Sequence, residues 1–437
     1  MTRLLITNFY SARNRGDAAI VLGMLRDLRA RSTFRDAEIV ISSSDPGFDG
    51  EHLPVPVIPS LRSLCARVVR APPLPELFLA LVVLPACLAW VLAHRVARAD
   101  LWLPAELRRV LRAYRDADLI VAAGGGYLYT TSSFKGNGVL LATVLSFLLG
   151  RLVGRPVVLY SQSIGPFSSR PQAWLVRRAL RCVQLIQVRE CRSLALLEGW
   201  GLGVPIVLTT DAAFLIEAET PPDVEPRAVG AVRVGFTVRH WFRRESDQLR
   251  YEGVLAAFVD WLITEEKADV VFVPQVTHTL ADDDDRAVAR RIVGRLRHPG
   301  GAQVLEAELR PGEIKGLCGQ MTYFVGTRMH SSIFALSMGV PVLAIACQPK
   351  TSGLMEQLGL GEWMVPIDSL RPHSLQDAYR RLVARGPDVR RRLASTIPEA
   401  TRSAMRNGQV IEEHYLRWSA GSDSGRGGPP PGWLPGP

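Results

Sequence analysis

The residues best suited to chemistry lie in one short run, Gly326 to Ser332, between a β-branched stretch and an apolar helical pattern. Arg328 and His330 are two residues apart, so an extended turn can present both on one side. Ser331 and Ser332 stand at the predicted helix start, where unpaired N–H groups can bind phosphate. An imidazole titrates near neutrality and suits general acid–base catalysis. The structural alternative is a surface arginine beside a helix-capping histidine.

A second polar loop, Asn14 to Asp17, follows the first predicted strand and opens a helix. Gly16 allows a ligand to approach the backbone, and the helix N-terminus can hold an anion or a hydroxyl group. Asp17 can accept a proton from a sugar hydroxyl, or it can simply be the N-cap of an ordinary helix. The local sequence leaves both interpretations open.

Three further groups follow other predicted strands. Gly124, Gly125 and Gly126 make room for a ligand or another backbone chain, or they form a tight turn, and they do not match a dinucleotide-binding fingerprint. Arg189 suits a carboxylate or phosphate, with a surface ion pair to Glu190 as the alternative. Arg239 also follows a strand, and Lys350 comes after the run at 326–332.

The sequence predicts no metal site. The acidic run 282–285 stands at a predicted helix start, where the helix dipole favours carboxylates. The six cysteines form no C-x-x-C pair, and no histidine stands beside them at metal-ligand spacing. We therefore expect buried, reduced thiols.

The elements that must position these residues alternate between β-branched runs and amphipathic helical runs, which is typical of parallel sheets covered on both faces. Ligands of such sheets bind at the carboxyl ends of the strands. Strands are predicted at 4–8, 38–42, 118–123, 156–162, 185–189, 206–209, 232–238, 270–274, 304–306, 323–325 and 342–346. Helices are predicted at about 18–30 and 251–266, and from about 283, 330, 374 and 398.

The chain of 437 residues suits two domains of this α/β class. We expect an N-terminal Rossmann-like domain over 1–216 and a C-terminal one over 231–395. The acidic, Pro-rich stretch 217–230 is the expected linker. A C-terminal helix over 396–420 and a disordered Gly/Ser/Pro-rich tail over 421–437 complete the expected organisation.

The net charge of +10 is dispersed, so it is weak evidence for nucleic acid and fits anionic small ligands or an anionic membrane surface. Leu77 to Ala93 is an apolar run without a charge, interrupted by Pro85 and at the lower edge of a spanning length. It could span a bilayer, lie in its interface, or be a buried helix. A second apolar run, 139–153, is expected to be a core helix. We expect a cytoplasmic protein with peripheral contact to the inner face of the plasma membrane, without nucleic acid as a partner.

Taken together, the motifs resemble those of the polysaccharide pyruvyl transferase family over about residues 3–360. They occur in the family's order: N-x-G-D at 14–17, G-G-G at 124–126, Q-x-I-G-P at 162–166, V-R-[DE]-x-x-S at 188–193, D-x-[AP]-F at 211–214, and G-x-R-x-H at 326–330 with a following G-x-P and Lys350.

The resemblance implies a fold similar to GT-B glycosyltransferases, with two Rossmann-like domains facing a central cleft. The N-terminal domain would then be the acceptor side and the C-terminal domain the donor side. It also implies phosphoenolpyruvate as donor substrate, with no cofactor, and a sugar or lipid-linked glycan as acceptor. Arg328, His330 and Asp17 are then the expected catalytic residues. Further donor-binding residues would be Arg189, Arg239, Ser331, Ser332 and Lys350, and the acceptor would bind at Asn14, Gly16, Gly124, Gly125 and Gly126.

Two rival functions remain open. A glycosyltransferase of the same fold would use a nucleotide sugar and usually needs an acidic residue for the ribose, for which Glu356 is the one candidate after Lys350. A catalytically inactive member of the family would serve as a scaffold, although Arg328 and His330 are both present.

Overall fold

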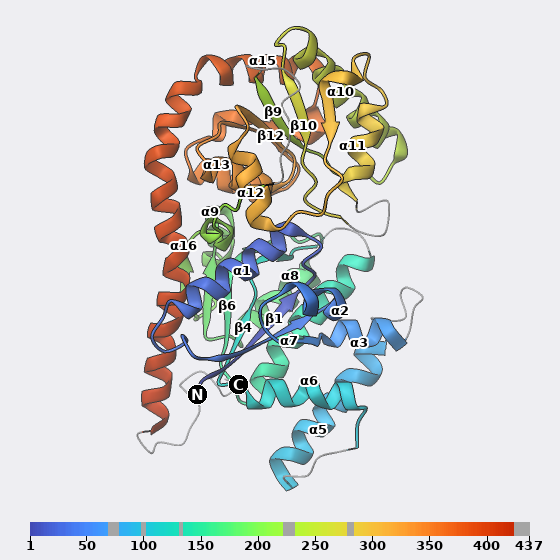
Figure 1. Ribbon diagram of the computed structural model, residues 1–437. Helices are drawn as coiled ribbons and strands as arrows, with labels where there is room; N and C mark the ends of the chain where they lie inside the picture. Colours follow the sequence, from blue (N-terminus) through green and yellow to red (C-terminus); the bar gives the residue numbers. More distant parts are fainter. Residues whose placement is uncertain (69–77, 98–101, 131–133, 222–231, 278–283, 424–437) are drawn as a thin grey trace. The chain divides into compact units, whose positions relative to one another are not determined.

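The computed structural model describes residues 1–68, 78–97, 102–130, 134–221, 232–277 and 284–423 (Figure 1). The chain divides into two compact units. Unit 1 comprises 1–12, 20–212 and the chain from 403 on, and unit 2 comprises 13–19 and 213–402. The expected division placed 13–19 with the N-terminal domain and kept the last helix apart. Most of the expected linker, 222–230, and the tail from 424 lie outside the described residues.

Unit 1 is built on one parallel sheet in the order β3-β2-β1-β4-β6-β7-β8, with β5 paired to β6. All four residues of β4 and all eight of β6 are buried, as expected of strands covered on both faces. The strands are β1 Arg3–Phe9, β2 Glu38–Ser43, β3 Val57–Pro59, β4 Leu119–Ala122, β5 Gly125–Leu128, β6 Val157–Ile164, β7 Leu185–Val188 and β8 Ile206–Leu208. Its helices are α1 Arg15–Arg29, which begins in unit 2, α2 Pro46–His52, α3 Leu61–Val68, η1 Leu79–Val83, α5 Leu84–Ala97, α6 Ala105–Asp116, α7 Phe134–Leu152, α8 Arg170–Leu180 and α9 Cys191–Glu198.

Unit 2 is built on a second parallel sheet in the order β11-β10-β9-β12-β13-β14. The chain winds one way from β9 and then returns to the other side at β12, so the switch point lies between these two strands. The strands are β9 Arg233–Thr237, β10 Asp269–Phe272, β11 Ala302–Val304, β12 Tyr323–Gly326, β13 Val342–Ala346 and β14 Met364–Pro366. The helices are η2 Ala212–Leu215, α10 Glu245–Thr264, α11 Asp285–Val293, η4 Pro299–Gly301, α12 Pro311–Gly319, α13 Met329–Ser337, α14 Pro349–Gln357, η5 Gly361–Trp363, η6 Ile367–Ser369, α15 Pro372–Ala384 and the start of α16 Gly386–Asp423.

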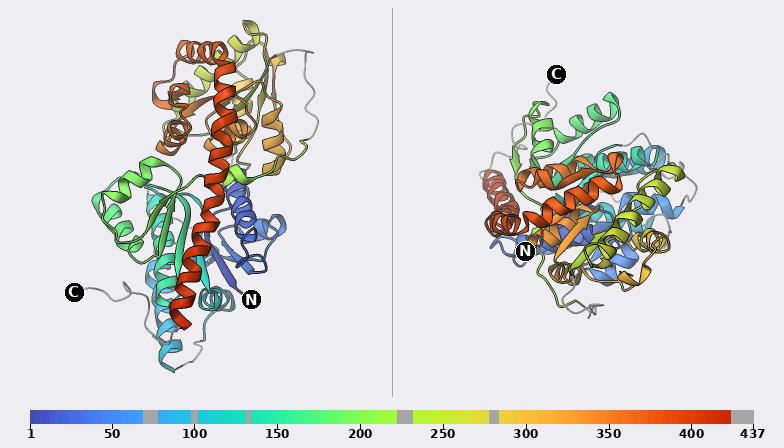
Figure 2. Two further views of the ribbon diagram at one scale, coloured as in Figure 1. Left: turned by 90° about the vertical axis from the view of Figure 1, so that its left-hand side faces the viewer. Right: turned by 90° about the horizontal axis from the view of Figure 1, so that it is seen from above.

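The two parallel sheets confirm the predicted α/β class, and every predicted strand is present within two residues of its expected ends. The prediction of a helix beginning at Pro398 is wrong. Pro398 lies inside α16, a single helix of 38 residues (Figures 1 and 2). A proline removes one backbone hydrogen bond and disfavours a helix interior. Here apolar residues before and after Pro398, including Leu393 and Ala404, are buried, and their packing keeps the helix continuous through the proline.

The two apolar runs behave differently. The run at 139–153 forms most of α7, whose Val144, Phe147 and Leu149 are buried in the core of unit 1, as predicted. The run at 77–93, described from residue 78, forms η1 and α5, and only one of its faces is buried. In the described parts of the chain, no helix is long and apolar enough to cross a membrane.

Candidate functional site

Four neighbouring strands of unit 2 end at one pocket, which encloses about 430 Å³ including solvent. Arg239 lies two residues beyond β9, Gln275 three beyond β10, and Thr327 directly follows β12. Cys347 directly follows β13. The pocket therefore straddles the switch point between β9 and β12, where ligands of doubly wound sheets bind. Its lining residues are Asn14, Asp17, Arg239, Gln275, Thr327, Arg328, Met329, His330, Cys347, Gln348, Lys350 and Thr351.

The segment 13–19 joins unit 2 through its backbone. The Arg15 N–H donates to the Gln275 carbonyl at 2.9 Å, and Asn14 forms an antiparallel bridge with Val276. The Asn14 side chain then organises the loop: its oxygen accepts from the Gly16 N–H at 3.1 Å, and its amide donates to Asp17 at 2.9 Å. These bonds hold the Asp17 carboxylate in a fixed place in the wall of the pocket.

Gly16 lies directly against the imidazole of His330. A β-carbon built on Gly16 would stand 2.1 Å from Nδ1 and 2.6 Å from Cγ of His330, far inside van der Waals contact. The His330 side chain is largely buried, and it occupies the second position of α13. The absence of a side chain at position 16 is therefore what allows the ring to stand beside the N-terminal loop.

Three cationic side chains line the pocket. Arg328 forms a 2.5 Å ion pair with Asp285, whose other oxygen accepts from the Gln275 and Val276 N–H groups at 3.0 Å each. The Arg239 guanidinium lies 4.9 Å from the centre of the Trp241 ring. Lys350 stands in the first turn of α14. With Asp285 neutralising one arginine, the lining retains an excess of positive charge that suits an anionic ligand.

Two helices also begin at the pocket. Arg328 and Gln348 are the N-cap residues of α13 and α14, and both line it. N–H groups in the first turn of a helix attract anions, so these two N-termini add to the effect of the cations. The turn between β12 and α13 is held by neutral hydroxyl groups, since the hydroxyls of Tyr251 and Thr327 lie 3.3 Å apart. Burial raises the pKa of Tyr251 well above its usual range, so this hydroxyl stays protonated.

Residues 14–349 match the sequence profile of the polysaccharide pyruvyl transferase family. The chain belongs to this family. The amylovoran biosynthesis protein AmsJ of Erwinia amylovora is 24% identical to it over 397 residues, 85% of this chain and 90% of that protein.

Solved structures confirm the two-domain GT-B-like architecture. The S. aureus MnaA–UDP complex has a TM-score of 0.58 at 12% identity and covers 96% of this chain and 97% of its own. Anabaena Alr3699/HepE in complex with UDP has a TM-score of 0.54 at 13% identity and covers 95% and 100%. At this identity the likeness shows the fold alone.

The matched segment of this pyruvyl transferase family member holds most of the pocket. Of the predicted site residues, the structure brings together Asn14, Asp17, Arg239, Arg328, His330 and Lys350, with Gly16 behind His330. Asn14 and Asp17 were assigned to the acceptor side, and they lie in the same pocket as the predicted donor residues. Glu356, considered for a ribose, is exposed near the far end of α14 and is not among the lining residues.

Ser331 and Ser332 are fully buried beneath the pocket and are not among its lining residues. The Ser331 hydroxyl contacts Thr237 at 2.8 Å and donates to the Arg328 carbonyl at 2.7 Å. Ser332 packs so closely on the backbone that a β-carbon on Gly326 would stand 2.2 Å from its oxygen. Their side chains support the turn from inside. The Ser332 N–H already donates to the Arg328 carbonyl at 3.2 Å, so contact of this pair with a donor substrate is left to the Ser331 N–H.

Arg189 and the three glycines belong to unit 1. The Arg189 side chain is buried, pairs with Asp211, and donates to Ser163 at 2.7 Å. Glu190, its expected alternative partner, caps α9 instead by accepting from the Ser193 N–H. Arg189 is thus an internal ion pair of unit 1, and its role in donor binding stays a prediction.

The run 124–126 is packed by its own surroundings. A β-carbon on Gly124 would stand 2.8 Å from Ile20 and 3.1 Å from the Tyr160 carbonyl, so close packing requires this glycine. Gly125 has a φ of +146° and begins β5. Gly124 thus makes room for the backbone of β6, and Gly125 and Gly126 lie in β5 and not in a tight turn. Acceptor binding at Gly124, Gly125 and Gly126 stays a prediction.

Sequence reasoning missed Gln275. It is 1% exposed, lines the pocket, and neither atom of its side-chain amide has a hydrogen-bond partner among the described residues. A buried amide without a partner is costly, so it marks a place where a ligand or water completes the site. The signal available in the sequence was its position shortly after a buried strand, which many other residues share.

The acidic run 282–285 is described from Asp284. Asp284 accepts from the Arg286 N–H as the N-cap of α11, which agrees with the expected helix start. Asp285, the next residue, has the further role of holding Arg328. Four of the six cysteines are buried thiols, as expected, whereas Cys191 is exposed and Cys347 lines the pocket.

Proposed function

We propose that this protein transfers pyruvate from phosphoenolpyruvate to a sugar of a cell-surface polysaccharide, or of its lipid-linked precursor, as a cyclic ketal. The observation that carries the proposal is the pocket of unit 2, where Arg239, Arg328 and Lys350 surround His330 and Asp17 in a chain of the pyruvyl transferase family. The name of AmsJ, a biosynthesis protein for amylovoran, supports a role in making polysaccharide.

The charges of the pocket suit this donor. Phosphoenolpyruvate carries a carboxylate and a phosphate on a small frame, and two arginines, one lysine and two helix N-termini offer a matching set of donors. Asp285 holds the Arg328 guanidinium in place, so Arg328 is the residue best positioned to make paired hydrogen bonds to one of the two anionic groups. We assign Gln275 to the same task, because a carboxylate or phosphate oxygen of the donor would accept a hydrogen bond from its unpartnered amide nitrogen.

The chemistry can be balanced with the residues present. His330 donates a proton to the methylene carbon of the donor, which leaves a cationic carbon beside the carboxylate. One sugar hydroxyl adds to that carbon, phosphate leaves with cleavage of its C–O bond, and a second hydroxyl of the same sugar closes the ketal. Two hydroxyl protons are released; one is taken up by Asp17 or the phosphate, and the other restores His330. We propose that neither a cofactor nor a metal takes part, so EDTA should leave turnover unchanged.

We place this activity in the cytoplasm, where phosphoenolpyruvate is made, at the inner face of the plasma membrane. Calorimetry with phosphoenolpyruvate and with UDP- and GDP-sugars tests the donor assignment. Binding of phosphoenolpyruvate alone is expected. Binding of a nucleotide sugar alone would replace the proposal by a glycosyltransferase of the same fold, and binding of neither would favour an inactive scaffold.

Two substitutions separate binding from chemistry. Arg328→Ala removes a charge-assisted contact, so donor affinity should fall by about 1.5–3 kcal/mol, roughly 10- to 150-fold. His330→Gln still fills its site, so donor binding should persist while turnover falls about 10²-fold or more. Arg385→Ala is the matched control, because Arg385 is an exposed arginine of unit 2 paired with Asp388. Near-normal turnover of His330→Gln would make His330 an orienting residue and leave Asp17 as the candidate acid.

A further inference from the structure

An exposed apolar stripe runs along η1 and α5 of unit 1. Its members, called here the α5 stripe, are Leu81, Val82, Pro85, Leu88, Ala89 and Leu92, and all six are exposed. Leu81 is 67% and Leu92 is 60% exposed. The spacing 81, 85, 88, 92 places these residues on one side of a helix. These side chains form one continuous apolar face of the helix instead of isolated exposed residues.

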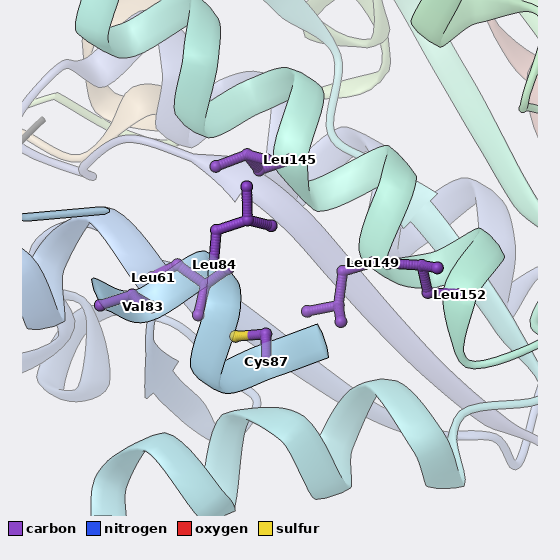
Figure 3. Close-up of a pocket in the computed structure, with 7 residues that line it drawn as sticks. All are labelled: Leu61, Val83, Leu84, Cys87, Leu145, Leu149 and Leu152. Atoms are coloured by element: carbon purple, nitrogen blue, oxygen red, sulfur yellow. The ribbon is translucent and has the colours of Figure 1, made fainter. Parts of the chain in front are cut away.

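The opposite side of the same helix is anchored in unit 1. Val83, Cys87, Trp90 and Val91 are buried in its hydrophobic core. Figure 3 shows Leu84 of α5 directed toward Leu145 of α7, and Cys87 and Leu149 line the same small apolar hollow. In Figures 1 and 2, α5 lies at the outer edge of unit 1. The helix thus already has a buried face, and the α5 stripe is a second apolar face that the described unit leaves uncovered.

The helices that pack beside η1 and α5 in unit 1 are strongly basic. Among the described side chains, α3, α6 and α7 carry Arg62, Arg67, Arg108, Arg109, Arg112, Arg115 and Arg151, against Glu106 and Asp116. No acidic or basic residue interrupts 78–93 itself. Trp102, which follows α5 in the chain, is 91% exposed. Apolar residues bordered by arginines, with an exposed tryptophan, have the composition of interfacial membrane segments.

We propose that the α5 stripe docks unit 1 onto the surface of an anionic phospholipid bilayer. Leu81, Leu88 and Leu92 enter the boundary between head groups and acyl chains, and the surrounding arginines contact the anionic head groups. The helix lies on the bilayer because its other face is fixed in the core.

A second copy of the chain is a poorer occupant. From residue 81 to 92 the stripe is roughly 16 Å long and one helix wide, on the order of 160 Å², whereas a stable dimer buries about 800 Å² on each partner. Two such basic surfaces would also repel each other. Docking needs neither donor nor acceptor, so this proposal stands or fails separately from pyruvyl transfer.

Flotation of the full chain with vesicles tests the proposal. The probes are vesicles of phosphatidylcholine and phosphatidylglycerol mixed two to one, and vesicles of phosphatidylcholine alone. The wild type should float with the first and bind the second at least about tenfold more weakly, because several arginines lose their anionic partners. The variant Leu81→Ser/Leu88→Ser/Leu92→Ser should bind the anionic vesicles about 10²-fold more weakly than wild type, as partial burial of three leucines predicts.

The matched control is Leu249→Ser/Met405→Ser/Leu416→Ser, which removes three exposed apolar side chains elsewhere and should bind vesicles like wild type. A fluorophore on Leu92→Cys, in a Cys191→Ser background, should shift to the blue on anionic vesicles, and one on Leu416→Cys should not. The proposal is overturned if the wild type floats with neither vesicle or equally with both. It is also overturned if the stripe variant floats like wild type, or if the stripe instead holds a dimer that the variant dissociates.

Discussion

Gly16→Ala is a test of the contact between the N-terminal loop and His330. The new β-carbon would stand 2.1 Å from Nδ1 of His330, whereas ordinary contact begins at 3.4 Å, so the ring must move by more than an ångström. Gly16 cannot easily move instead, because its N–H is bonded to Asn14. A displacement of about 1 Å in a catalytic group can cost 10²-fold in rate, and overpacking costs about 1–3 kcal/mol of stability. We therefore expect turnover to fall about 10²-fold in a protein that still folds.

The assay is release of phosphate from phosphoenolpyruvate with the p-nitrophenyl glycoside that gives the highest wild-type rate. Thermal unfolding and donor calorimetry on the same samples report folding and binding. Gly253→Ala is the matched control: it is also a helical glycine of unit 2, and nothing lies within 4 Å of its added β-carbon. That variant should keep wild-type turnover and gain about 0.5–1 kcal/mol of stability.

The His330→Ala background shows whether the loss acts through the ring. If it does, adding Gly16→Ala to His330→Ala should lower the residual rate by less than about threefold, because the colliding atoms are gone. Wild-type turnover of Gly16→Ala would refute the contact as described. A full 10²-fold further loss in the His330→Ala background would refute its route through His330.

Two further predictions concern buried carboxylates. Asp285→Asn weakens the anchor of Arg328, so KM for phosphoenolpyruvate should rise about tenfold with kcat nearly unchanged; tighter donor binding would show that Asp285 only neutralises Arg328. In unit 1, burial raises the pKa of Asp49 from 3.8 to about 6. The folded state therefore binds the proton more tightly than the unfolded state does. The free energy of unfolding should fall by about 3 kcal/mol as the pH rises from below 3.8 to above 6. Urea unfolding of wild type and Asp49→Asn at pH 4 and pH 7 checks this, and parallel pH profiles would contradict it.

The fold could be predicted because its strands are buried on both sides. Apolar runs such as 157–160, which is fully buried, are typical of strands covered by helices on both faces. The missed strands are β3, β5 and β14, each of three or four residues, where apolar patterning is too brief to be read. Ends of helices were less predictable, as Pro398 shows, because tertiary burial outweighed a local propensity.

The site could be predicted from the sequence only where its residues lie close together in the chain. Arg328 and His330 share one turn, so their joint presence in the pocket follows from the strand–turn–helix pattern. Asp285 was assigned to a helix start, and nothing in its local sequence reveals its ion pair with an arginine so distant in the chain. Gln275 was missed for a similar reason, since its unpartnered amide is visible only once the surrounding side chains are placed.

The assignment of residues 13–19 to unit 2 changes how the two halves divide the chemistry. A donor side in one domain and an acceptor side in the other would keep Asp17 apart from His330. Instead the first turn of α1 bonds to the loop after β10, and its glycine meets the imidazole. The proposed proton donor and the proposed hydroxyl base therefore stand in one pocket, and the cations that suit the donor stand beside both. Ketal formation needs a proton on the methylene carbon of the donor and deprotonation of the sugar hydroxyl that attacks the adjacent carbon. A site that unites an acid and a base is therefore what the proposed reaction requires.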